Sequence, residues 1–167
     1  MGRVIAAAVL IVAVVAGPGL AAGLPGQAPL DAGELAAYRL TTDVFARFQS
    51  ASRAIAAATR DDPAFALDPL FTREVLVSGD APSAARTLET RLQAHPALAA
   101  ALRAGKLSAR DYTKFALALV AARLAHGFVK TGVLRRVPDG TAAANVAFVA
   151  AHESAISSLL ADLGIDG

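Results

Sequence analysis

The chain has 167 residues, of which 55% are hydrophobic and 5% aromatic, and it contains no cysteine or tryptophan. The lack of thiols excludes disulfide bonds, zinc–thiolate sites, covalent c-type haem and thiol nucleophiles. The formal charge is +2, or about +1 without Arg3, and the basic residues are scattered, so no nucleic-acid partner is predicted.

The first residues have the pattern of a secretory signal peptide. Arg3 precedes an apolar run over residues 4–16, which residues 17–19 (Gly-Pro-Gly) then break before further small residues. We expect a signal peptide over residues 1–21 with cleavage after Ala21. An uncleaved anchor is disfavoured because the apolar run is shorter than the ~20 residues of a membrane span. The predicted location is the bacterial periplasm or the exterior, with no transmembrane anchor after cleavage.

Prolines and glycines follow and predict a flexible leader over residues 22–38, with a helical turn or two from Glu34. The folded domain is expected over residues 39–167. Thr41 has the position of a helix N-cap, and its helix is predicted to end near Thr59. The inward positions of this helix follow helical spacing: Phe45, Phe48, Ser52 and Ile55.

Three shorter segments come next. Residues 63–82 carry two Asp-Pro pairs among large apolar residues, and they predict short helices or an irregular lid against the bundle. A helix is expected from about Pro82 to His95. A shorter helix is expected over residues 96–104, with Gly105 as a left-handed terminator.

Residues 108–131 predict the long helix around which the domain is built. Ser108 is the expected N-cap, and Asp111 has the spacing of a capping box. Beyond this turn the helix is apolar on nearly every side, which is typical of a buried helix. Its large apolar residues are Phe115, Leu117, Leu119, Val120, Leu124 and Phe128.

A last helix is expected over residues 141–163, ended by Gly164. The predicted fold class is therefore all-α. It is a single compact bundle of three long and about two short helices around the buried central helix (residues 108–131). Roughly 130 residues are enough to bury a core without disulfides or metal.

Four segments resemble a family of small exported bacterial helical proteins. They are LTTDVFARF (residues 40–48), HPALAAAL (95–102), LSARDY (107–112) and NVAFVAAHE (145–153). The family has no assigned activity. The resemblance implies bacterial export and a helical fold, and it supplies no catalytic residues.

Arg123 and His126 lie three residues apart and therefore on the same side of the central helix. One interpretation is a polar pocket that holds an anionic group inside the bundle. The other is a buried arginine that pairs with an acid, with the histidine hydrogen-bonded nearby. We favour the pairing, because a buried charge without a partner is costly. The candidate acids are Asp43, Glu74 and Glu153.

His152 and Glu153, together with His126, are the one set that suggests metal ligands. The His-x-x-x-His and Glu-x-x-His spacings of metal-binding helices are missing, so no metal and no cofactor is predicted. We expect His152 at a helix surface or bonded to a neighbouring carbonyl. The sequence shows neither a glycine-flanked nucleophilic serine nor a phosphate-binding loop.

These patterns favour a non-enzymatic binding module of the envelope that binds a protein partner or a small apolar ligand. The alternative is a small metal-binding protein or enzyme that uses Arg123, His126, His152 and Glu153. Membrane binding is not favoured, because the polar faces of the helices lack the lysine-rich character of membrane-binding helices. Their apolar stripes are assigned to the core.

Overall fold

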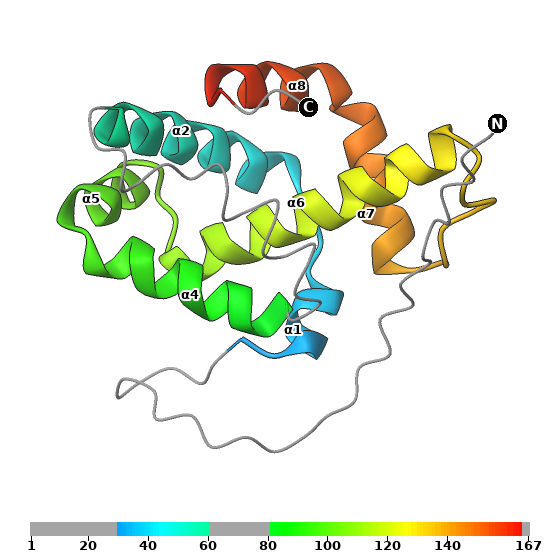
Figure 1. The fold of residues 1–167 in the computed structure, drawn as a ribbon, viewed down its shortest axis with the longest axis horizontal. Helices are drawn as coiled ribbons and strands as arrows, with labels where there is room; N and C mark the ends of the chain where they lie inside the picture. The colour runs from blue at the N-terminus through cyan, green and yellow to red at the C-terminus, as the bar shows by residue number, and fades with distance from the viewer. Residues whose placement is uncertain (1–29, 61–80, 165–167) are drawn as a thin grey trace, which may run out of the picture.

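The computed structural model describes residues 30–60 and 81–164, and every regular element in these ranges is an α-helix (Figure 1). The helices are α1 (Ala32–Ala37), α2 (Thr42–Thr59), α4 (Ala81–Ala94), α5 (Pro96–Ala104), α6 (Ala109–Lys130), α7 (Thr141–Ala151) and α8 (Glu153–Asp162). The predicted all-α class is confirmed. The expected signal peptide, the first part of the expected leader, and nearly all of the lid expected over residues 63–82 lie outside the described residues.

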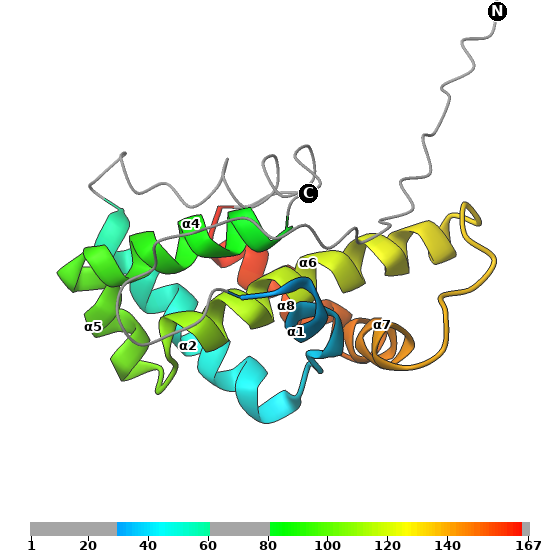
Figure 2. The same ribbon diagram turned by 90° about the horizontal axis from the view of Figure 1, so that it is seen from below.

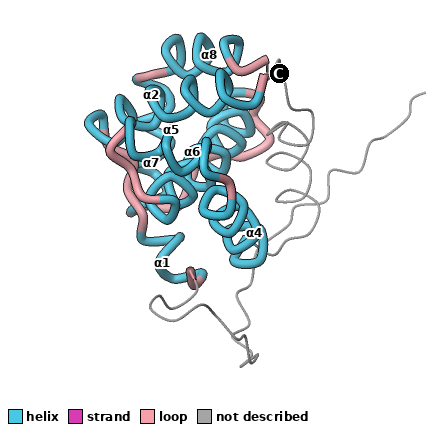
Figure 3. The backbone as a smooth tube through the Cα atoms, turned by 90° about the vertical axis from the view of Figure 1, so that its left-hand side faces the viewer, coloured by secondary structure: helices cyan, strands magenta, loops and turns pink. Residues whose placement is uncertain are grey.

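Helix α6 lies in the middle of the described structure. Figures 1 and 3 show α4 along one side of it and α2 along the other, while α7 crosses its C-terminal part. The packed helix pairs include α4 with α6, α6 with α7, and α2 with both α5 and α6. Most of the core therefore forms around the first part of α6.

The two strongest cap predictions are confirmed. The Ser108 Oγ accepts the backbone N–H of Asp111 at 3.0 Å and donates its own proton to the Asp111 carboxylate at 2.7 Å. Thr41 accepts the backbone N–H of Val44 through its hydroxyl oxygen at 3.4 Å. These caps satisfy amides that have no partner inside the first turn, so the helix starts are set by local sequence.

An aromatic cluster fills the core between α2, α6 and α7. Phe115 of α6 is fully buried, and its ring centroid lies 4.7 Å from that of Phe48 and 6.0 Å from that of Phe45. Phe148 of α7 meets Phe45 edge-on at 5.7 Å. Such pairs add about 0.5–1.5 kcal/mol each to the effect of burial, so this cluster joins the three helices. Burial also raises the pKa of the adjacent Tyr112 to about 12.

Helix α1 is held against α6 by charge and by apolar packing. Glu34 accepts a hydrogen bond from Arg110 at 2.5 Å and forms an ion pair with Lys114. The hydrogen bonds from Arg110 and Lys114 lower the pKa of Glu34 below its ordinary value of 4.5. Leu30 is buried and packs with Ala85 and Leu117. Residues 30–38, which the sequence assigned to a flexible leader, are therefore packed against the bundle.

One buried side chain, Asn145, joins α7 to the segment between α1 and α2. Asn145 of α7 accepts the backbone N–H of Leu40 through its Oδ1 atom at 2.9 Å. Its Nδ2 atom donates to the carbonyl oxygen of Tyr38, also at 2.9 Å. The amide thus satisfies the N–H of Leu40 and the carbonyl of Tyr38, and it fixes the α1–α2 connection on α7.

The last helix differs from the expectation, because residues 141–163 form two helices that meet at His152. The backbone of His152 has φ −117° and ψ 18°, which lies outside the helical range. Its ring stacks on Phe148 at a centroid distance of 4.1 Å, and its Nδ1–H donates to the Phe148 carbonyl at 2.9 Å. The bend lays α8 over α2, where Arg53 pairs with Asp162 at 3.0 Å (Figure 1).

Gly105 ends α5 for a different reason from the one expected. Its φ is −77°, and the left-handed residue of this turn is Lys106, with φ 55°. A Cβ atom at Gly105 would lie 2.7 Å from the Cβ of Ala51 in α2. Glycine is therefore required here by the close approach of α5 to α2, not by a left-handed backbone.

We predict that Asn145→Ala lowers the free energy of unfolding by about 2–4 kcal/mol, because it leaves two buried backbone groups without a partner at roughly 1–3 kcal/mol each. Urea unfolding followed by circular dichroism measures the change. The exposed Ser154 on α8 provides the control, since Ser154→Ala should stay within about 0.5 kcal/mol of the wild type. Equal effects of the two substitutions would contradict the role assigned to Asn145.

Candidate functional site

The structure does not bring the four predicted site residues together. Arg123 is exposed, and it makes no hydrogen bond or ion pair with the residues that the structure describes. The expectation that Arg123 is buried is therefore wrong, and so is its expected pairing with Asp43 or Glu153; the third candidate acid, Glu74, lies outside the described residues. An exposed guanidinium keeps its hydration, so no desolvation cost requires a partner.

His126 and Glu153 do approach each other, where the second half of α6 lies near the start of α8. The Nε2 atom of His126 lies 3.9 Å from the Glu153 carboxylate, and it has no hydrogen-bond partner among the described residues. Lys130 takes the place predicted for Arg123, because it donates to Glu153 at 2.9 Å. This hydrogen bond is the main reason why the pKa of Glu153 is below its ordinary value of 4.5. The group is an ion pair with a histidine beside it.

His152 directly precedes Glu153 in the chain, but its ring contacts Phe148 and Thr42 and not the Glu153–Lys130 pair. Because a carbonyl only accepts, the Nδ1 atom of His152 carries the proton that is donated to Phe148. In the neutral ring the Nε2 atom is then an acceptor, and it lies 3.5 Å from the Thr42 hydroxyl. The expected bond from His152 to a neighbouring carbonyl is thus present, and it occupies the Nδ1 atom.

The most unusual surface lies at the free end of α6. Leu124 is 37% exposed, Phe128 is 46% exposed and Val133, in the following loop, is 53% exposed. We call these three residues the α6 tip. They include every large hydrophobic residue that is exposed in the ranges 30–60 and 81–164. Both Leu124 and Phe128 were predicted to be core residues, and this prediction is wrong.

The exposure of the α6 tip has a geometric cause. Leu117 and Leu124 lie seven residues apart on one side of α6, because seven residues make about two helical turns. Leu117 is only 7% exposed, since Leu30 and Ala85 cover it. Helix α4 runs antiparallel along α6 (Figure 1); Leu92 and Ala109 line one cleft, and Ala85 and Leu117 belong to one buried cluster. In this register α4 begins opposite residue 121, so the same stripe of α6 emerges uncovered just beyond that point.

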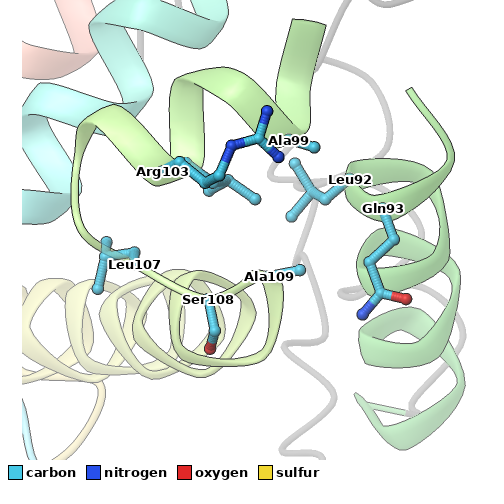
Figure 4. A pocket seen from close by; sticks show the side chains of 8 residues that line it. Leu92, Gln93, Ala99, Arg103, Leu107, Ser108 and Ala109 are labelled. Carbon is cyan, nitrogen blue, oxygen red and sulfur yellow. The ribbon is translucent and has the colours of Figure 1, made fainter. Parts of the chain in front are cut away.

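A second surface feature is a small open cleft at the other end of α6. It has a volume of about 200 Å³ and lies between α4, α5 and the start of α6 (Figure 4). Arg103 of α5 and Leu92 of α4 face each other across it. Small-molecule sites usually enclose about 300–1,000 Å³, so this cleft is too small and too open for a typical ligand site.

Within residues 30–60 and 81–164, no three His, Asp or Glu side chains are grouped so that they could hold a metal ion. None of the helices in the same ranges is long and apolar enough to span a bilayer.

Comparisons of this chain with known protein families, with curated proteins and with solved structures found no match. The resemblance to small exported helical proteins therefore stays a prediction. The α6 tip was not found by sequence reasoning, because its residue types do not differ from those of the buried half of the same helix.

We predict that the pKa of Glu153, measured by NMR titration of its side chain, lies below 4.5 and rises toward 4.5 in Lys130→Met. His126→Gln should change this pKa less, because the charge of His126 is the smallest of the effects that lower it. Since the folded-state pKa is lowered, the ion pair stabilises the protein above pH 4.5 and loses this effect as the pH falls through the folded-state value. An unchanged pKa in Lys130→Met would show that this ion pair does not form.

Proposed function

We propose that this protein is a non-enzymatic binding module of the bacterial envelope, and that the α6 tip is its contact surface. One observation carries the proposal. All of the exposed large hydrophobic residues in the described ranges fall between residues 124 and 133, on one helix end and its loop. Apolar side chains gathered at one place on a surface are typical of interaction sites, whereas scattered ones are not.

Export is part of the proposal and is supported by the sequence. Arg3, the apolar run over residues 4–16 and the small residues after it fit a cleaved secretory signal. The cysteine-free composition fits an oxidising compartment, since no thiol is left to react there. The expected location is the periplasm or the exterior of the cell.

The alternative, a metal-binding protein or enzyme, has less support. It requires the side chains of Arg123, His126, His152 and Glu153 to converge, and the one side-chain approach among these four in the described residues is His126 to Glu153, at 3.9 Å. The carboxylate of Glu153 is already bonded to Lys130, and His152 already bonds the Phe148 carbonyl. A catalytic or metal-binding arrangement needs such groups directed at a common point.

A photo-crosslinking experiment tests the proposed contact surface. Phe128 is replaced by p-benzoylphenylalanine, which keeps the phenylalanine ring and adds a photoreactive benzoyl group, and intact cells that export the protein are irradiated. We expect one discrete adduct, with a protein or with a lipid, identified by mass spectrometry. Because Phe128 is half-exposed, we expect its replacement to change the free energy of unfolding by less than about 0.5 kcal/mol.

The matched control carries the same photoreactive residue at the exposed Arg91, in the last turn of α4. Figure 1 shows α4 leading into α5 at the end of the structure away from the last turns of α6. No adduct should form there. Identical adducts at both positions, or none at residue 128, would contradict the proposed function.

A further inference from the structure

The position of the α6 tip and the charged residues near it indicate what kind of partner fits this surface. Figures 1 and 2 show the last turns of α6 and the loop of residues 131–140 projecting at one end of the described structure, beyond α4 and α5. The α6 tip therefore lies at a projecting end of the described structure. The loop folds back on the helix, because Gly132 has φ 75° and the backbone N–H of Leu134 donates to the Phe128 carbonyl at 3.0 Å.

Cations lie on the same last turns of α6 and on the loop that follows. Arg123, Arg135 and Arg136 are exposed, and none of them makes a hydrogen bond or an ion pair with a described residue. Lys130 is also exposed and is bonded to Glu153. The acids in this region are Asp139 and Glu153, so the cations outnumber them. The charges lie on the loop as well as on the helix, which is why no lysine-rich helix face was visible in the sequence.

These observations select among the occupants of the α6 tip. A second copy of the chain would bring the same arginines against each other, which costs free energy. A small apolar ligand needs an enclosing pocket, and the cleft that the described residues form lies at the other end of α6. An anionic bilayer surface fits both features, because Leu124, Phe128 and Val133 would enter the headgroup region while the arginines contact lipid phosphates.

We propose that the α6 tip binds the surface of anionic membranes, as a peripheral contact that does not span the bilayer. This inference rests on the proposed function, since it names the partner of the same surface. The apolar residues supply insertion, and Arg123, Arg135 and Arg136 supply attraction to phosphate. Neither part suffices alone, because a few partly exposed apolar residues bury little area and a few cations are screened by salt.

Vesicle binding of the purified full chain tests this inference. Co-sedimentation is measured with sucrose-loaded vesicles of phosphatidylglycerol and phosphatidylcholine (1:1), and with vesicles of phosphatidylcholine alone. We expect binding to the anionic vesicles that weakens as salt is added. Removing two cations by Arg135→Gln/Arg136→Gln should lower the partition coefficient by about thirtyfold, at roughly 1 kcal/mol for each cation. Phe128→Ser should lower it by about tenfold, through lost apolar burial.

Arg91→Gln/Lys106→Gln is the matched control, because it removes the same charge from exposed positions in the last turn of α4 and in the turn between α5 and α6. It should bind nearly as well as the wild type. All variants share the same N-terminal residues, so any contribution of the apolar run over residues 4–16 is common to them.

Equal binding to both vesicle types, equal loss in the two double variants, or no binding at all would overturn the lipid inference. The crosslinking result separates this failure from failure of the proposed function. A discrete protein adduct at residue 128 without vesicle binding would keep the α6 tip as a contact surface and assign it to a protein. No adduct at residue 128 would contradict both the proposed contact surface and the lipid inference.

Discussion

The structure depends on the burial of the first half of α6. Phe115 has no exposed surface and contacts Phe45 and Phe48 of α2, while Leu119 is 5% exposed on the same half. Burying a side chain of this size contributes roughly 1.5–3 kcal/mol, so this short segment holds much of the stability of the domain. The smaller elements attach to it or to its neighbours: α1 through the Glu34 ion pairs, and the α1–α2 connection through Asn145.

The α6 tip exists because α6 is longer than the helix that covers it. Helix α6 has 22 residues and α4 has 14. At ~1.5 Å per residue the difference is about 12 Å, and the antiparallel register places the surplus at the C-terminal end of α6. The apolar stripe of α6 continues past the point where α4 begins, so Leu117 is covered while Leu124 is exposed.

Local features of the fold were predictable from sequence. The cap at Ser108 and the helix that follows it depend on neighbouring residues, and the structure confirms them. The inward face of α2 also follows from its spacing, because Phe45, Phe48, Ser52 and Ile55 are all buried. Helical periodicity predicts which side of a helix is apolar, although it does not state how far along the helix a neighbour extends.

The features that sequence did not predict depend on contacts distant in the chain. Gly105 is required by Ala51 on another helix, and the break at His152 depends on stacking against Phe148. Arg123 was expected to need an acid because the whole of α6 was expected to be buried. The exposure of its last turns removes that requirement. The same exposure turns two expected core residues, Leu124 and Phe128, into a candidate binding surface.

Thiol labelling measures the exposure of α6 most directly, because the chain has no cysteine of its own. Single variants Leu117→Cys, Leu119→Cys, Leu124→Cys and Phe128→Cys are reacted with a maleimide under native conditions. At Leu124 and Phe128 the thiol should react at nearly the rate of a free thiol. At Leu117 and Leu119 it should react about a hundredfold more slowly, or less, because labelling there requires local opening of the core. Equally slow labelling at all four positions would show that α6 is covered along its whole length, and would contradict this account.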